Sequence, residues 1–456
     1  MATKVTPLSG FPELLPAERL VELHFLDTIR EVFELHGFTP IETRSVEPVE
    51  RLVGQGGDAD KEIYGLRRLA AEKDGPGGRD RDAELGLHFD LTVPFARYVL
   101  EHAGRLDFPF RRYQIQKVWR GERPQQGRFR EFTQADIDVV DVSELAPHFE
   151  AEMPLVIAEV FGRLPVGEFH IQVNNRKITE GFYRGLGLTD IPGTLRIVDK
   201  VDKIGPEAVH RLLVESGATE EQGQRCLALG QIRSDDTSFI DQVRALGVSH
   251  PVLDEGLAEL VRVIETGRVV APGVLVADLK IARGLDYYTG TVYETQIVGG
   301  EEWGSVCSGG RYDSLASDGR TTYPGVGISI GVSRLVHLLI DHRGLRASRR
   351  TPAAVLIALA DEESRPRSTA VATALRSRGI PCEVAPKADR FGKQIRYADR
   401  RGIPYVWFPG GGGEADLHPD QVKDIRTGEQ VAADPATWQC PAEDLRPVIA
   451  GESPSA

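Results

Sequence analysis

The sequence predicts a multidomain protein of the mixed α/β (α+β) class. The chain has 456 residues, which is more than one hydrophobic core usually organises, so two or three domains are expected. Two long alternating runs between residues 111 and 140 indicate a β-hairpin, whereas residues 190–270 carry helically spaced apolar side chains and little strand pattern. The last hundred residues alternate short strands with helices, which is typical of a separate α/β domain.

The N-terminal elements are predicted from spacing and from turn residues. Apolar side chains within residues 16–36 recur at helical intervals, and Gly37 follows where a helix commonly ends. Pro40 fixes an extended backbone after this helix. The composition of residues 75–81 predicts a Gly-rich polar loop, and residues 87–100 indicate a short strand that runs into a helix.

Further elements follow the hairpin and the helical stretch. Residues 273–299 indicate two β runs around a turn, and the strand GVGISIGV leads directly into a helix that ends near His342. In the last part of the chain, strands are expected at 353–359, 381–386 and 404–410. The expected domains are a core of residues 1–189 and 271–342, a helical insertion of residues 190–270, a linker of residues 343–350, an α/β domain of residues 351–447 and a flexible tail of residues 448–456.

Cysteine usage and hydropathy restrict the compartment. The four cysteines lie at least 58 residues apart, so neither a closely spaced metal knuckle nor a dense disulfide framework is available. A reducing cytoplasm is therefore expected. The N-terminus has no apolar signal region and no uninterrupted apolar stretch reaches 18 residues, so we expect no association with membranes.

The net charge is negative, but its distribution is uneven. The 55 basic and 68 acidic residues give −13, which taken alone argues against nucleic acid as a partner. Residues 111–130 nevertheless contain seven basic residues and one acidic residue, and residues 364–407 contain ten and three. The first stretch calls for an anionic ligand, whereas a basic run on a helix is usually a solvated face.

The second strand of the hairpin carries a distinctive set of side chains. At a spacing of two residues, Phe132, Gln134, Asp136 and Asp138 share one face. Beside several arginines, such a face could hold a planar base, a polyphosphate and a cationic or imidazole group. The alternative is a solvated, salt-bridged hairpin.

Five segments together resemble a known enzyme family. The string VWRGERPQQGRFREFTQADID resembles motif 2 of class II aminoacyl-tRNA synthetases, PGVGISIGVSRL resembles motif 3, and GFTPIET resembles the end of motif 1. ARGLDYYTGTVYE and SGGRYD resemble the two signature motifs of histidyl-tRNA synthetases. The resemblance implies a class II catalytic domain with an antiparallel sheet and a helical insertion, followed by an α/β anticodon-binding domain.

The resemblance implies an ATP site on motifs 2 and 3. Arg120 would bind the α-phosphate and the amino-acid carboxylate as a catalytic residue, Glu122 would meet the adenine amino group, and Phe132 would stack on adenine. Arg334 would cover the other face of the base and reach the γ-phosphate; Arg128 would also contact ATP. The resemblance also implies that Arg283 is a second catalytic arginine at the α-phosphate, the alternative being a turn arginine that neutralises Asp286.

The resemblance further implies a histidine pocket. Asp138 and Tyr288 would bond the two imidazole nitrogens, and Tyr312 would close the pocket, although each tyrosine could instead be an amphipathic core residue. The α-amino group would be bound by Asp90, Thr92 and Gln134. Gly309 and Gly310 would let the backbone approach the aminoacyl group closely.

Contacts to tRNA are implied at both basic stretches. Arg123 and Gln125 match the motif 2 loop that approaches the acceptor end, and Lys393, Arg396 and Arg400 lie in the anticodon-binding domain. In one departure from the family pattern, Ser333 precedes Arg334 where a glutamate is common.

The implied function is a histidine–tRNA ligase reaction. Histidine and ATP, the latter with Mg²⁺, would give histidyl-adenylate, and histidine would pass to the 3′ end of histidine tRNA. Motif 1 implies a homodimer, and neither a prosthetic group nor a protein-bound metal is expected. One alternative is a catalytically silent paralogue that serves as a regulatory subunit in histidine biosynthesis, and another is an RNA-binding module without turnover. Neither alternative would catalyse histidine-dependent ATP–pyrophosphate exchange.

Overall fold

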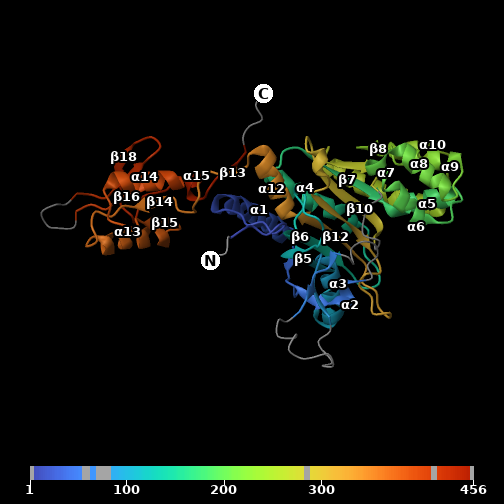
Figure 1. The fold of residues 1–456 in the computed structure, drawn as a ribbon, viewed down its shortest axis with the longest axis horizontal. Helices are drawn as coiled ribbons and strands as arrows, with labels where there is room; N and C mark the ends of the chain where they lie inside the picture. Colours follow the sequence, from blue (N-terminus) through green and yellow to red (C-terminus); the bar gives the residue numbers. More distant parts are fainter. Residues whose placement is uncertain (1–4, 54–61, 68–83, 282–287, 412–417, 452–456) are drawn as a thin grey trace. The chain divides into compact units, whose positions relative to one another are not determined.

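The computed structural model describes residues 5–53, 62–67, 84–281, 288–411 and 418–451. The chain divides into two compact units (Figure 1). The first holds residues 25–338 together with the segment before residue 13, and the second holds residues 13–24 and 339–456. The expected boundaries placed residues 13–24 and 339–342 with the core, whereas they group with the second unit.

A nine-stranded sheet is the centre of the first unit. Its strands, in spatial order, are β1 (Thr39–Pro40), β5 (Phe110–Trp119), β6 (Glu131–Val140), β12 (Gly325–Gly331), β11 (Cys307–Tyr312), β10 (Tyr288–Ile297), β7 (Phe169–Asn175), β9 (Leu275–Asp278) and β8 (Arg233–Ser234). Pairing is antiparallel from β5 through β7, and parallel between β1 and β5 and between β7 and β9.

The predicted hairpin is confirmed, with Trp119 opposite Glu131 at its loop end. The two β runs expected within residues 273–299 also form strands. They are not neighbours, however, because β7 lies between β9 and β10 and pairs with both.

The two faces of the central strands differ in chemistry. On one face, Ala135, Ile137 and Val139 of β6 are fully buried, and the apolar residues of β12 are buried with them. The helix α4 (His148–Arg163) contacts β12. The other face carries the polar residues of β6. The alternating pattern therefore separates a packed side from a functional side.

Further elements are the helices α2 (Val49–Leu52) and α3 (Thr92–His102), the 3₁₀ turns η3 (Ala103–Arg105) and η4 (Glu301–Trp303), and a small sheet of β2 (Val46–Pro48), β4 (Leu85–Leu87) and β3 (Gly65–Leu66). The helices α1 (Pro16–Leu35) and α12 (Val332–Arg343) have residues in both units. The predicted strand-to-helix transitions at residues 87–100 and 325–342 are both present.

The predicted insertion is largely helical. It consists of α6 (Ile191–Val198), α7 (Val201–Ile204), α8 (Pro206–Glu215), α9 (Glu220–Leu229), α10 (Phe239–Ala245) and α11 (Pro251–Val270), preceded by α5 (Arg176–Gly185). Figure 1 shows α6 and α8–α10 gathered beside α5. A capping box of Thr219 and Gln222 begins α9. Strand β8 is the exception within the helical stretch.

The second unit contains a five-stranded mixed sheet. Its order is β15 (Cys382–Val384), β14 (Val355–Ile357), β16 (Tyr405–Phe408), β17 (Gln421–Asp424) and β18 (Gln430–Ala432), with the first three parallel. The helices are α13 (Arg365–Ser377), α14 (Phe391–Arg401) and α15 (Ala442–Leu445). The sequence did not predict β17 and β18.

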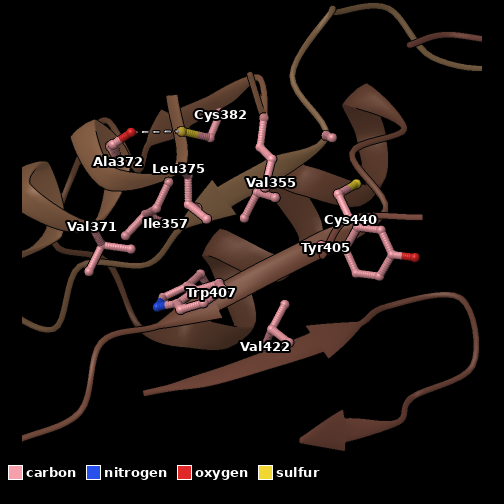
Figure 2. Close-up of a cluster of buried hydrophobic side chains, with 12 residues drawn as sticks. Val355, Ile357, Val371, Ala372, Leu375, Cys382, Tyr405, Trp407, Val422 and Cys440 are labelled. Carbon is pink, nitrogen blue, oxygen red and sulfur yellow. Dashed lines mark hydrogen bonds between the residues drawn. The ribbon is translucent and has the colours of Figure 1, made fainter. Parts of the chain in front are cut away.

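The core of this sheet lies around Trp407, which is fully buried. Figure 2 shows Val355 and Ile357 of β14 between α13 and β16, with Tyr405 and Trp407 beside Val422 of β17. The thiol of Cys382 donates to Ala372 O at 3.5 Å. The strand pattern predicted for residues 353–410 thus buries a continuous apolar layer.

The expected linker and tail contain ordered structure. Strand β13 (Arg346–Ala347) lies in the predicted linker and pairs with β19 (Ile449–Ala450) in the predicted tail. Residues 449–450 of the tail expected to be flexible are therefore held by backbone pairing with the linker. The residues after 451 lie outside the described residues.

Candidate active site

The register of the sheet builds a polar surface on β6 and its neighbours. Asp136 lies opposite Ser329 of β12, and Asp138 lies opposite Gly327. On the other side, Arg112 of β5 lies opposite Asp138. Because opposite residues in a sheet share a face, these side chains all point to the same side.

A cavity of about 290 Å³ lies along this surface. Of the predicted site residues, it is lined by Arg120, Glu122, Arg128, Phe132, Gln134 and Arg334. It is also lined by Glu62, Gly127, Phe129, Ser305, Val306, Cys307, Ser308, Ser329 and Gly331. All five residues predicted to bind ATP are therefore brought together, with Gln134 beside them.

Arg120 and Arg128 of the cavity are each held by a contact with the protein. The Nε of Arg120 donates to Phe89 O at 3.0 Å, and its guanidinium lies 5.1 Å from the centre of the Phe132 ring. The guanidinium of Arg128 lies 3.5 Å from the Glu122 carboxylate. These contacts place two positive groups and one aromatic face on one wall.

Arg334 lines the cavity from the first turn of α12. Its guanidinium donates to Trp303 O, while its Nε is buried. Burial, reinforced by the charge of Arg128, lowers the pKa of Arg334. A buried guanidinium that is destabilised by a neighbouring cation would gain from a polyanionic ligand.

Not all of the charge counted in the hairpin faces the cavity. Arg111 pairs with Glu152 at 2.5 Å, Arg112 pairs with Asp138 at 2.5 Å, and Lys117 pairs with Glu131. These three of the seven basic residues are paired with carboxylates of the protein and do not line the cavity. The expectation that this whole density serves an anionic ligand is wrong for these three.

A cluster of buried carboxylates lies beyond the arginines. Asp138 accepts from the Tyr312 hydroxyl at 2.7 Å and pairs with Arg112, which is 0% exposed and stacks 4.2 Å from the Phe95 ring. Burial raises the pKa of Asp138 to about 6, although Arg112 opposes the shift. Asp138 and Tyr312, predicted in one pocket, are therefore in direct contact.

Asp90 belongs to the same electrostatic cluster. Its Oδ1 accepts from Val93 N at 3.1 Å, so it caps the start of α3, which begins at Thr92. Its Oδ2 is buried and has no hydrogen-bond partner among the described residues. Burial raises the pKa of Asp90 to about 6, and the charges of Arg120 and Arg112 oppose this.

The glycines near the pocket are required by packing between strands. A Cβ on Gly309 would lie 2.1 Å from Gly327 O, and one on Gly310 would lie 2.8 Å from Thr291 O and from the Tyr288 ring. Both glycines are thus packed closely against neighbouring strands and an aromatic ring, and their approach to the aminoacyl group stays a prediction. Tyr288 lies opposite Tyr312 in the sheet, which places both tyrosines on the pocket side.

Several residues that support the site were not identified from the sequence. A Cβ on Gly327 would lie 2.0 Å from the Asp138 carboxylate, and one on Gly325 would lie 2.6 Å from the Tyr312 ring. Arg112 and Ser329 also contact the acidic residues of β6 directly. The alternation of glycine and serine in GVGISIG was the available signal, since small residues leave room for an opposing functional side chain.

Ser333 has a structural role in place of the glutamate common in the family. It is 6% exposed, and its hydroxyl accepts from Thr133 N at 2.9 Å. This bond connects the start of α12 to β6, next to Phe132 and Arg334. Arg283 lies outside the described residues.

The residues predicted to contact tRNA lie on two surfaces. Arg123 and Gln125 are exposed in the loop between β5 and β6, where Gln125 bridges to Arg128. In the second unit, Lys393, Arg396 and Arg400 line one hollow of about 480 Å³ on α14. Their spacing of three and four residues places all three on one helix face.

The comparisons agree with this architecture. Residues 10–335 match the family model for histidyl-tRNA synthetase, and residues 353–436 match the model for an anticodon-binding domain. Together these define an aminoacyl-tRNA synthetase with separate catalytic and anticodon-binding parts.

The histidine–tRNA ligase of Micrococcus luteus is 59% identical over 97% of this chain and 98% of its own length, and that of Cutibacterium acnes is 58% identical over 98% and 99%. The crystal structure of histidyl-tRNA synthetase from Nostoc sp. superposes with a TM-score of 0.82 at 36% identity, covering 94% of this chain and 97% of that one. The chain belongs to the histidyl-tRNA synthetase family. The regulatory-subunit alternative is less supported, because these relatives are ligases over nearly the full chain.

Proposed function

We propose that the arginine-lined cavity binds ATP and that the buried carboxylate cluster beside it selects histidine, so that the chain performs the histidine–tRNA ligase reaction at this sheet. The observation that supports this proposal is the continuous polar face of β6. Phe132 and Gln134 line the cavity, and Asp138 lies four residues further along the same face. One strand thereby sets the spacing between the reacting phosphate and the imidazole pocket.

In the first step, a carboxylate oxygen of histidine attacks the α-phosphorus of ATP. A new P–O bond forms as the bond to the bridging oxygen of pyrophosphate breaks, and pyrophosphate leaves with the electron pair. Arg120 would stabilise the negative charge on the α-phosphate oxygens, and Arg128 and Arg334 would hold the phosphates that leave. Mg²⁺ enters with ATP as part of the substrate complex. The role of Arg283 stays a prediction.

Histidine selection requires partners for both imidazole nitrogens. The Asp138 carboxylate would accept from one ring N–H, and the Tyr288 hydroxyl would donate to the other nitrogen. The bond that Tyr312 donates to Asp138 orients the carboxylate, and Arg112 keeps it anionic. A side chain that lacks either nitrogen would leave a buried polar group unpaired, which discriminates strongly.

Transfer to tRNA follows at the same sheet. A hydroxyl of the terminal ribose attacks the adenylate carbonyl, and AMP leaves. Arg123 and Gln125 would guide the acceptor end from the loop above the cavity. The α14 face of Lys393, Arg396 and Arg400 would contact the anticodon region through phosphates.

The deciding experiment measures histidine-dependent ATP–pyrophosphate exchange and charging of histidine tRNA on the purified chain. Exchange that requires histidine and no other amino acid is the expected result. A chain that binds histidine or RNA without exchange would instead support a regulatory subunit or an RNA-binding module.

We further propose that the protein is a cytoplasmic homodimer, on the basis of its motif 1 resemblance and its cysteine usage. Among the described residues, no helix is long and apolar enough to cross a membrane. Sedimentation equilibrium should give twice the chain mass of 50.1 kDa. A mass equal to one chain at micromolar concentration would contradict the dimer.

A further inference from the structure

A short chain of hydrogen bonds runs behind the cavity between β6 and β12. The amide nitrogen Nε2 of Gln134 donates to Ser329 Oγ at 2.7 Å, and Ser329 Oγ donates to Asp136 Oδ1 at 2.5 Å. Gln134 and Ser329 line the cavity, whereas Asp136 lies behind them and is 2% exposed. The proposed reaction assigns no role to Asp136 or to Ser329.

The direction of this chain is fixed by chemistry. An ionised carboxylate can only accept, so the Ser329 hydroxyl must use its single proton toward Asp136. The oxygen of Ser329 is then left to accept from Gln134, which must present its NH₂ group to Ser329. The other end of the amide, the Oε1 atom, consequently points away from this hydrogen-bonded chain of Gln134, Ser329 and Asp136, which we call the relay. This atom is buried and has no hydrogen-bond partner among the described residues.

An acceptor at this place suits one part of an amino-acid substrate. An α-ammonium group carries three donors and no acceptor, so it bonds the oxygen of an amide and is repelled by its NH₂ group. The two ends of a glutamine amide are nearly equal in size, so packing alone selects between them weakly. A hydrogen-bonded partner that distinguishes oxygen from nitrogen is needed.

We propose that Asp136 and Ser329 are positioning residues that hold the Gln134 amide with its oxygen toward the cavity, so that it accepts from the α-ammonium group of the amino-acid substrate. This inference rests on the proposed function, in which Gln134 binds that group. It also predicts a switch. A proton on Asp136 would let the acid donate to Ser329, Ser329 would then donate to Gln134 Oε1, and the NH₂ group would face the cavity.

The charged and polar groups around Asp136 determine the pH at which this switch occurs. Arg112 of β5 favours the carboxylate, whereas Asp138 of β6 and Asp90 before α3 oppose it. On the remaining sides are Gln114 of β5 and the Cys307 thiol of β11, whose own pKa is raised by burial and by Asp136. Burial outweighs Arg112 and raises the pKa of Asp136 to about 7. The relay should therefore weaken as the pH falls below 7.

The test compares two ligands that differ only in the ammonium group. Histidine carries it, whereas imidazole-4-propionate has the same ring and carboxylate but lacks it. Affinities come from the KM for histidine in ATP–pyrophosphate exchange and the inhibition constant of imidazole-4-propionate at pH 8. We expect Ser329→Ala to weaken the affinity for histidine roughly tenfold, which is the size typical of a lost hydrogen bond to a charged group. The affinity for imidazole-4-propionate should stay within about twofold of the wild-type value.

Asp136→Asn tests the switch, because the amide cannot take up a proton. In the wild type, the ratio of the two affinities should fall as the pH is lowered from 8 to 6, and in Asp136→Asn this ratio should be constant. Each affinity is corrected for the titration of that ligand's own imidazole, because the ammonium group of histidine lowers its ring pKa relative to that of imidazole-4-propionate. Ser329→Thr, which retains the hydroxyl, should restore the wild-type ratio, and Ser216→Ala, which removes a hydroxyl at the end of α8, should behave as the wild type.

The outcomes separate the relay from the function. Suppose that the wild type exchanges pyrophosphate, but that Ser329→Ala either weakens the affinity for both ligands equally or weakens neither. The relay is then refuted and the proposed function stands. If the wild type shows no histidine-dependent exchange, the proposed function fails and the relay fails with it. Each variant should unfold within a few degrees of the wild-type unfolding temperature. Where a variant differs more, the ratio of its two ligand affinities still tests the relay.

Discussion

At the scale of single residues, Asp90 combines a structural role with a costly charge. Its Oδ1 caps α3, and burial raises its pKa to about 6, above a value of about 4 in an unfolded chain. The folded protein therefore holds this proton to higher pH than the unfolded chain does. Stability falls as the pH rises through this window, because the unfolded state releases the proton first.

We expect Asp90→Asn to raise the free energy of unfolding at pH 7.5 by roughly 1–3 kcal/mol, since asparagine keeps the cap and removes the buried charge. The gain should shrink as the pH falls from 6 to 4 and should vanish below about pH 4, where the carboxyl is protonated in both states. The same variant should raise the KM for histidine if Asp90 binds the α-amino group. Urea denaturation at several pH values checks the first expectation, and a pH-independent gain would contradict it.

Gly327 is a second residue whose effect can be predicted. An added Cβ would lie 2.0 Å from the Asp138 carboxylate, so Gly327→Ala must displace that carboxylate or the strand. We expect the KM for histidine to rise at least tenfold and the KM for ATP to change less than about threefold, because Asp138 does not line the ATP cavity. Gly104→Ala is the matched control, since nothing lies within 4 Å of its added Cβ. Equal effects on both substrates would contradict this assignment.

The same residues show what the sequence could and could not reveal. Period two placed Gln134, Asp136 and Asp138 on one face because strand geometry alone determines that. It could not assign partners, because Ser329 is 193 residues from Asp136 and Arg112 meets Asp138 only through the register of the hairpin. Part of the hairpin's positive charge was therefore misread as ligand-binding charge. Ion pairing across strands depends on register, which composition does not contain.

At the scale of elements, helices and long strands were predicted better than short ones. The hairpin and the helical insertion have many periodic residues, so their patterns are clear. Strands β17 and β18 have only three or four residues each, and β13 and β19 have two. Such strands form because a neighbouring edge offers backbone hydrogen bonds, and this tertiary cause leaves little trace in local sequence.

Helix α14 is the element whose function can be tested by itself. Lys393, Arg396 and Arg400 share one face and are exposed, whereas Gln394 is buried and bonds Leu359. We expect the triple change to Ala to weaken binding of histidine tRNA at least tenfold and to reduce the slope of log affinity against log salt by up to about three. Histidine-dependent exchange without tRNA should be unchanged. Arg211→Ala on α8, also exposed, is the control. An unaltered salt slope would exclude phosphate contacts at this face.

At the scale of the whole molecule, the net charge of −13 conceals two basic stretches on an acidic background. Residues 111–130 contribute +6 and residues 364–407 contribute +7, so the remaining residues sum to −26. The structure reduces the attractive part further, because Arg111, Arg112 and Lys117 are paired and Arg401 pairs with Glu383. Attraction for RNA is thus confined to small areas, and the rest of the surface repels phosphate.

This charge distribution predicts that the protein binds RNA less specifically when acidic residues outside the two basic stretches are neutralised. We expect a variant with four exposed glutamates of the insertion changed to Gln to bind unrelated RNA roughly two- to tenfold more tightly at low salt. The positions are Glu207, Glu215, Glu220 and Glu221. Charging of histidine tRNA should keep its kcat/KM within about twofold, because none of these residues lines the cavity or the α14 hollow. The opposite change, with Arg211 and Arg225 made Gln, should weaken binding of unrelated RNA. If both variants bind unrelated RNA as the wild type does, the acidic surface does not limit non-specific binding, and specificity must come from the contact surfaces alone.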